Sequence, residues 1–348
     1  MRRSVTLTIV LAITGLLGGG LFRYIFNDPS EASVANYLRS CTHGVALALV
    51  MGSVHLYFSS RSSAWVRRWP FVVELLIRSI TMAVVLAITA IAMEVILYDH
   101  RIEFGWIAGD FPKIMGFSLG LSVPFSTAYE LTRMTGGRTL LHVLLGRYRR
   151  PIREQRVLLF LDLVGSTSLA EAMGELRVQE LLTRFFFDID EAIVSHGGEV
   201  HAYVGDEVIV TWPVNASPSS RRYLDCVFAI DDRLAELADD YRREFGTVPA
   251  FRAGMHAGTV VISECGDSRR QLAYFGDTVN VTARLQQHCK VVGRALLVSG
   301  ELLRLLPEDA NVIIEPLGAT RLRGRAAPIE IFAVARREAA TARRQASS

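Results

Sequence analysis

Charge is scarce in this sequence, and its cysteines follow no recognisable pattern. Charged residues make up 21% of the 348 residues, 50% are hydrophobic, and the formal net charge is only +3. A nearly neutral chain lacks the basic surface that binds nucleic acid, so no nucleic-acid partner is expected. The four cysteines have no CxxC spacing, which argues against a disulfide framework or a zinc site and favours free thiols. The apolar content also excludes a mainly disordered chain.

Long apolar runs are concentrated in residues 1–135. Ser4–Phe22 has nineteen residues without a charge and Ser40–Ser60 has twenty-one, each enough for one helical crossing of a lipid bilayer. Phe71–Tyr98 is a third apolar stretch, and Phe111–Leu131 is a fourth with an uncharged centre of sixteen residues. The sequence therefore predicts an α-helical transmembrane bundle of four spans.

Charge alternates between these runs. The N-terminus and the second and last connecting segments carry arginines, whereas the first and third loops are mainly acidic. Because basic segments stay on the cytoplasmic side, this order predicts both termini and the C-terminal half in the cytoplasm, at the inner (plasma) membrane. An alternative makes Met1–Gly20 a cleaved signal peptide, which would export the C-terminal half and contradict the arginine bias around it.

The chain beyond residue 156 changes to a soluble α/β pattern. Strand-like apolar runs alternate with helical stretches, and glycines mark the turns. This alternation predicts one α/β domain over residues 157–336 with helices covering a sheet, preceded by a basic connector over 136–156 and followed by a disordered tail over 337–348. The expected elements are a strand at Val157–Leu161, a helix to about His196, a hairpin at Glu199–Trp212, a helix at Ser219–Phe245 and a strand at Phe251–Ser263.

Two aspartates stand at the ends of strand-like runs. Asp162 in FLDLVGST precedes the small-residue turn Gly165-Ser166-Thr167, a candidate phosphate-binding turn that opens a helix. Asp206 lies 44 residues later in YVGDEVIV, at a glycine turn. Two such carboxylates on neighbouring strands could share a pair of Mg²⁺ ions. Taken alone, each aspartate is more simply explained as a turn former or helix cap.

A second group of candidates is basic or amidic. FGDTVNVTARLQ places Asn280 and Arg284 four residues apart, on one face of a predicted helix, where they suit a ribose oxygen and a phosphate. Arg252 in FRAGMHAG, and Arg323 and Arg325 in LRGRAAPIEIF, could each reach a polyphosphate. A solvated helix face and ordinary surface arginines are the simpler alternatives for each group by itself.

Five segments taken together carry a family resemblance. FLDLVGSTSLAE, YVGDEVIVTW, FRAGMHAG, FGDTVNVTARL and LRGRAAPIEIF resemble, in this order and spacing, the class III nucleotidyl cyclase catalytic domain. The resemblance covers about residues 155–335. It implies a ferredoxin-like βαββαβ palm that acts as a head-to-tail homodimer, with active sites built from both chains at the interface. The N-terminal half matches only the general layout of membrane-anchored bacterial cyclases.

The resemblance also implies roles for individual residues. Asp162 and Asp206 match two metal-binding aspartates, with the Leu163 carbonyl as a further ligand for two Mg²⁺ (or Mn²⁺) ions per site. Arg252 matches a phosphate-contacting arginine of the same subunit. The partner would supply Asn280 to orient the ribose and Arg284 for the transition state. Arg325, or alternatively Arg323, falls where the family has a triphosphate-binding lysine.

The implied reaction converts ATP to 3′,5′-cyclic AMP and pyrophosphate for intracellular signalling. The ribose 3′-oxygen attacks the α-phosphate, so catalysis consists of positioning and charge stabilisation, and no protein nucleophile is needed.

Two positions depart from the family pattern. Where the family commonly selects adenine with a Lys and an Asp or Thr, this chain has Ala202 and Ala273, which cannot hydrogen-bond a purine edge. His201 and Gln271 would substitute only if the local register bends.

Three functions therefore remain open. The leading one is a membrane-anchored adenylate cyclase, because both aspartates and the matching arginines and asparagine are present. The two alanines favour either a guanylate cyclase with relaxed base selectivity or a non-catalytic nucleotide-binding receptor module. A diguanylate cyclase is excluded, because GGE at 197–199 and GDE at 205–207 do not form its contiguous motif.

Overall fold

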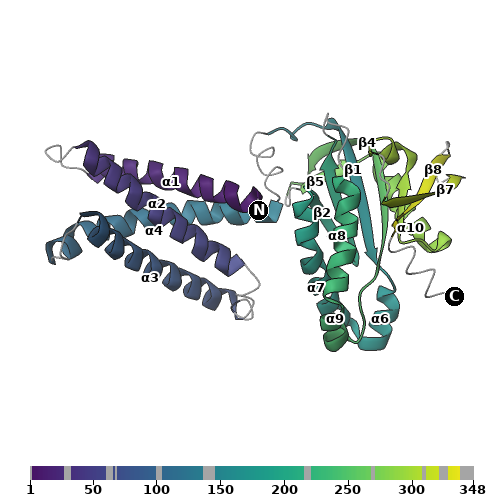
Figure 1. Cartoon of the computed structure of the whole chain (residues 1–348), viewed down its shortest axis with the longest axis horizontal. Helices are drawn as coiled ribbons and strands as arrows, with labels where there is room; N and C mark the ends of the chain where they lie inside the picture. Colours follow the sequence, from purple (N-terminus) through teal and green to yellow (C-terminus); the bar gives the residue numbers. More distant parts are fainter. Residues whose placement is uncertain are drawn as a thin grey trace. The chain divides into compact units, whose positions relative to one another are not determined.

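The structure is a computed structural model of the 348-residue chain. The chain divides into two compact units, Met1–Thr135 and Gly136–Ser348 (Figure 1). The expected tail beyond Arg337, and both Arg323 and Arg325, lie outside the described residues. The described residues are 2–26, 33–59, 66, 69–98, 104–135, 146–214, 221–267, 271–307, 311–320 and 328–337.

The first unit consists of long helices. Among the described residues, three helical segments are long and apolar enough to cross a membrane, which supports a membrane-associated unit. The helices are α1 (Arg2–Phe26), α2 (Val34–Ser59), α3 (Phe71–Tyr98) and α4 (Phe104–Thr135). The candidate spans within them are Thr8–Phe26, Val34–Phe58 and Leu76–Ile96.

The expectation of four spans is corrected on one point. The segment Phe111–Leu131 lies inside α4, but the three candidate spans identified in the described residues do not include it. Its uncharged centre contains Pro124 together with glycines and serines that lower its hydropathy, and the charged residues Lys113 and Glu130 flank that centre. The described part of the unit therefore contains four helices, of which three qualify as candidate spans.

Small residues allow α1 and α2 to approach closely. A Cβ atom on Gly15 would lie 2.5 Å from the carbonyl oxygen of Gly44, and one on Gly19 would lie 2.1 Å from that of Ser40. At these distances only hydrogen fits, so the glycines allow the two backbones to touch, a common way for membrane helices to associate. The contact between α2 and α3 is a buried cluster of Leu47, Met51, Leu86 and Ala90.

The second unit is built on an eight-stranded sheet with the order β2-β3-β1-β4-β6-β8-β7, in which β5 pairs with β4. Its first four strands pair in antiparallel fashion and form, with the helices between them, the expected ferredoxin-like βαββαβ unit. The strands are β1 (Ile152–Leu163), β2 (Glu199–Val204), β3 (Glu207–Pro213), β4 (Phe251–Cys265), β5 (Gln271–Phe275), β6 (Leu296–Ser299), β7 (Val312–Thr320) and β8 (Ile329–Arg336). The helices are α6 (Ser166–Met173), α7 (Glu175–Ser195), α8 (Arg222–Glu236), α9 (Ala238–Phe245), α10 (Asp277–Val292) and α11 (Gly300–Leu303).

Strand β1 is covered on both faces, which explains its continuous apolar run. Leu159 and Leu161 belong to the main core, which they share with residues of α7 and α8; these helices lie together along the sheet in Figure 1. Leu158 and Phe160 point to the opposite face, where residues of β5 and α10 pack against them. The strand begins at Ile152, inside the segment expected to be connector, because its polar first residues pair with the long strand β4.

The cysteines agree with the expectation from their spacing. All four thiols are free, with Cys226 and Cys289 buried and Cys41 and Cys265 half-buried.

Candidate active site

The ends of neighbouring strands bring three acidic residues and one arginine together. Asp162 is the penultimate residue of β1, and its sheet partners are Glu207 on β3 and Arg252 on β4. Asp206 lies in the tight turn between β2 and β3. The Leu163 N–H donates a hydrogen bond of 3.3 Å to the Asp206 carbonyl, which fixes this turn beside the end of β1.

This cluster carries more negative charge than its surroundings compensate. Partial burial and the nearby Asp206 raise the pKa of Asp162 to about 6, although Gln286 and Arg252 act in the opposite direction. Burial, followed by the charges of Asp162 and Asp206, raises the pKa of Glu207 to about 7. A divalent cation would relieve this repulsion.

The donor atoms available here fit Mg²⁺ or Mn²⁺. Mg²⁺ is held by oxygen atoms, commonly by one or two carboxylates together with water and substrate phosphates. Within the described ranges, no group of three or more His, Cys, Asp or Glu side chains forms a metal centre. A cation held by Asp162 and Asp206 would thus draw its other ligands from the Leu163 carbonyl, water and a phosphate.

The expected phosphate-binding turn follows β1 directly. Gly165 adopts a left-handed conformation with φ 74°, which glycine tolerates, and the eight-residue helix α6 starts at Ser166. The Ser166 hydroxyl donates a hydrogen bond to the Oδ2 atom of Asp206. Thr167 is exposed. Ser166 is therefore bonded to the Asp206 carboxylate, while Thr167 is accessible to a ligand.

Helix α10 carries Asn280, which is exposed, and Arg284, which is half-buried. No hydrogen bond or ion pair among the described residues joins either of them to Asp162 or Asp206. Within one chain, the structure thus brings together the two aspartates and Arg252, and among the described residues no hydrogen bond or ion pair joins this group to Asn280 or Arg284.

Sequence reasoning missed two residues of the cluster. Gln286 on α10 is 6% exposed, and its Nε2 donates a hydrogen bond of 3.1 Å to Asp162 Oδ2. Glu207 could have been found, because it follows Asp206 directly and an acidic pair after a glycine turn is visible in the sequence. Gln286 leaves no comparable signal, since a glutamine on a helix is normally solvated.

The two positions expected to contact the base lie on β2 and β5, at Ala202 and Ala273, both half-buried. The pairing of β2 with β3 shifts register between Val200 and Ala202, leaving His201 as the extra residue. The His201 ring lies 4.2 Å from the ring of Tyr274, centre to centre. The register therefore does bend at His201, whereas Gln271 pairs regularly with Cys265.

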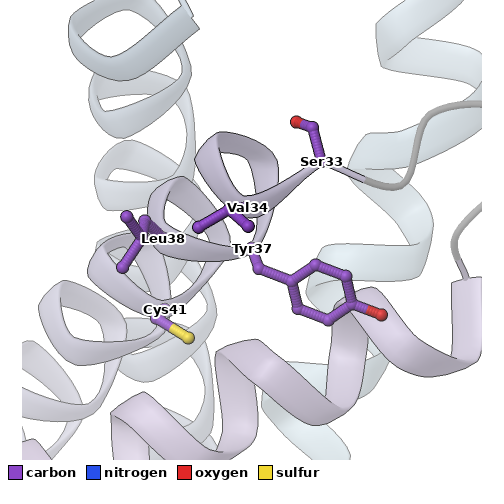
Figure 2. A pocket seen from close by; sticks show the side chains of 5 residues that line it. All are labelled: Ser33, Val34, Tyr37, Leu38 and Cys41. Carbon is purple, nitrogen blue, oxygen red and sulfur yellow. The ribbon is translucent and has the colours of Figure 1, made fainter.

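A separate pocket of about 330 Å³ lies in the first unit (Figure 2). No candidate active-site residue lines it. Its walls are one hydroxyl, one thiol, one phenol and aliphatic side chains, so it offers no carboxylate to a cation. The lining residues are Ser33, Val34, Tyr37, Leu38 and Cys41.

Comparison with known proteins establishes the family. The sequence pattern described as "Adenylate and Guanylate cyclase catalytic domain" matches residues 151–335, more than half of the chain. The chain belongs to this family, the class III nucleotidyl cyclases that the five sequence segments resemble.

Individual relatives agree with this assignment. Adenylate cyclase 2 of Rhizobium meliloti (strain 1021) is 37% identical over 222 residues, covering 64% of this chain and 61% of the relative. Adenylate cyclase 1 of the same strain is 30% identical over 187 residues, covering 52% of this chain and 28% of the relative. The chain thus spans less than two thirds of the length of either relative. The structure of a bacterial light-regulated adenylyl cyclase matches with a TM-score of 0.53 at 20% identity, covering 68% of this chain and 67% of that one, and confirms the fold.

Proposed function

We propose that this protein is a membrane-anchored adenylate cyclase that converts ATP to 3′,5′-cyclic AMP and pyrophosphate. The observation that carries the proposal is the convergence of Asp162, Asp206 and Arg252 at the end of β1, in a chain of the cyclase family. The identity of 37% with an adenylate cyclase supports ATP as the substrate.

The residues of one chain would bind the cations and the phosphates. Asp162, Asp206 and the Leu163 carbonyl would hold two Mg²⁺ or Mn²⁺ ions, which supply charge stabilisation to the attacking and leaving oxygens when bound. Arg252, the sheet partner of Asp162, would bind a phosphate oxygen. Gly165 and Thr167 would offer backbone N–H groups of the turn to the same triphosphate.

A second copy of the chain would complete the site. Among the described residues, Asn280 and Arg284 form no hydrogen bond or ion pair with the aspartates of their own chain, and a homodimer in which α10 reaches the partner's aspartates would account for them. Asn280 would orient the ribose, and Arg284 would stabilise the charge that develops on the transferred phosphate. Arg325, or Arg323, would add a cation for the triphosphate.

The first unit would anchor the enzyme in the inner (plasma) membrane. Its three candidate spans support insertion into a lipid bilayer. The arginines between Arg133 and Arg156 support a cytoplasmic position for the catalytic unit, because basic segments beside membrane helices remain on that side.

Base selectivity separates this proposal from a second candidate, a guanylate cyclase with relaxed base selectivity. Ala202 and Ala273 favour the second candidate, because neither side chain distinguishes adenine from guanine by hydrogen bonding. Purified protein would be given ATP and GTP separately and together, with Mg²⁺ or Mn²⁺, and the cyclic products measured.

Preferential formation of cyclic AMP supports the adenylate cyclase, and comparable cyclic GMP supports the second candidate. Nucleotide binding without a product contradicts both and indicates a non-catalytic receptor module. The double variant Ala202→Lys/Ala273→Asp should increase the preference for ATP by at least about tenfold, because polar partners would then contact the base. The control variant Gln271→Ala should leave the preference for ATP over GTP unchanged.

A further inference from the structure

Gln286 is a buried polar side chain that the proposed reaction does not use. It lies on α10 beside Leu285, which is fully buried, and is itself 6% exposed. Its Nε2 donates a hydrogen bond of 3.1 Å to the Oδ2 atom of Asp162, across 124 residues of sequence. A buried amide is costly unless it is hydrogen-bonded, so this bond orients both side chains.

The backbone at Gln286 is itself closely held. A Cβ atom on Gly254 of β4 would lie 2.3 Å from the Gln286 backbone nitrogen, so helix and strand are in direct contact there. At the start of α10, the Thr278 hydroxyl donates a hydrogen bond of 2.7 Å to the Thr259 carbonyl on β4. The amide of Gln286 therefore approaches Asp162 from a fixed support.

Each of the two candidate carboxylate ligands has one oxygen atom bonded to a neutral donor. Gln286 bonds Asp162 Oδ2, and the Ser166 hydroxyl bonds Asp206 Oδ2. A neutral donor orients a carboxylate without cancelling the negative charge that a cation needs, whereas a lysine or arginine at that place would compete with the cation.

We propose that Gln286 is a positioning residue for the divalent cation: it orients the Asp162 carboxylate and links it to the helix that carries Asn280 and Arg284. The inference rests on the proposed function, because Asp162 must be a cation ligand. In the proposed homodimer, one α10 then serves two sites, its own through Gln286 and the partner's through Asn280 and Arg284. Cation binding at one site and helix position at the other are thereby connected.

The test measures Mn²⁺ binding to the full-length protein directly, by electron paramagnetic resonance of free Mn²⁺, without nucleotide. Gln286→Leu and Gln286→Met remove the donor but keep a similar volume, and the unbranched methionine keeps the test intact if leucine prevents folding. Both should weaken Mn²⁺ binding about ten- to a hundredfold, as loss of a residue that orients a metal ligand does. Gln287→Leu is the matched control, because Gln287 is the exposed neighbour on the same helix.

Unchanged Mn²⁺ affinity in both Gln286 variants, together with a lower unfolding temperature, would assign Gln286 a purely structural role and overturn the inference. Asp162→Asn must also weaken Mn²⁺ binding, and if it does not, the inference fails at its first step. Formation of cyclic AMP is measured separately. A wild-type protein whose Mn²⁺ binding depends on Asp162 and Gln286, yet which forms no cyclic nucleotide, would refute the proposed function while supporting this inference.

Discussion

Gly254 of β4 lies against the backbone of Gln286 in α10, where an added Cβ atom would be only 2.3 Å from the Gln286 nitrogen. A second glycine of the same strand, Gly258, faces Thr278, which lies nearer the start of α10. A Cβ atom added to Gly258 would lie 2.5 Å from the Oγ1 atom of Thr278. These two contacts set the height of α10 above the sheet. They explain why the segment FRAGMHAG has a glycine on each side of the buried His256.

Replacing Gly254 or Gly258 with alanine should destabilise the protein by different amounts. Gly254→Ala places a methyl group against backbone atoms that cannot rotate away, and should destabilise the protein by about 1–3 kcal/mol. Gly258→Ala meets the end of the Thr278 side chain instead of backbone atoms, and should cost less. Denaturant unfolding of the two variants measures the difference. Equal stability of both variants and the wild type would contradict the close packing of α10 on β4.

Local signals allowed much of this arrangement to be predicted. The apolar run that ends at Asp162 and the glycine turn at Asp206 are features of short segments, and the structure has a strand end and a turn there. The contact between Gln286 and Asp162 joins residues 124 positions apart, and nothing near Gln286 in the sequence indicates it. The same limitation applies to the register shift at His201, which depends on pairing with β3.

Sequence composition predicted the membrane-spanning helices of the first unit less well than local motifs predicted the strands and turns of the α/β unit. The four helices were predictable from their apolar runs, but helix length and membrane-spanning hydropathy are separate properties. In α4, Pro124 and several small residues lower the hydropathy of a segment that is nevertheless helical. Whether a residue such as Gly44 faces another helix is likewise a tertiary property, which the sequence pattern leaves open.

The stability of the cation-free protein should depend on the acidic cluster. The pKa of Asp162 is raised from 3.8 to about 6 and that of Glu207 from 4.5 to about 7. Because the folded state holds these protons more tightly than the unfolded state, their contribution to stability is greatest at low pH and is lost as pH rises through these values. The unfolding temperature of the wild type should therefore fall relative to that of Asp162→Asn between about pH 4 and pH 7.

Added Mg²⁺ should reduce this difference at neutral pH, because the cation replaces the lost protons. The measurement is thermal unfolding of both proteins across this pH range, with and without Mg²⁺. Parallel curves for wild type and variant would show that Asp162 does not titrate in the way the cluster requires.

The close contact between α1 and α2 leads to a prediction for the first unit. An added Cβ on Gly44 would lie 2.2 Å from the carbonyl oxygen of Gly15, so Gly44→Leu should separate the helices and destabilise the unit by about 1–3 kcal/mol. Gly116→Leu in α4 is the matched control, because a Cβ there meets no described atom within 4 Å. Thermal unfolding in detergent compares the two. A similar loss of stability in both variants would contradict the α1–α2 packing.

The central claim is that Asp162 is part of the machinery that forms a cyclic nucleotide. The most direct measurement is cyclic AMP formation from ATP, with Mg²⁺ or Mn²⁺, by the purified full-length protein and by its Asp162→Asn and Asp239→Asn variants. Asp239 is a suitable control, since its side chain is 88% exposed and pairs with Arg242 on a surface helix. The account predicts that Asp162→Asn lowers the rate about a hundredfold or more, because the bound cation contributes several kcal/mol to the transition state, and that Asp239→Asn leaves it unchanged. Full activity in Asp162→Asn, or no cyclic nucleotide from the wild type, would contradict it.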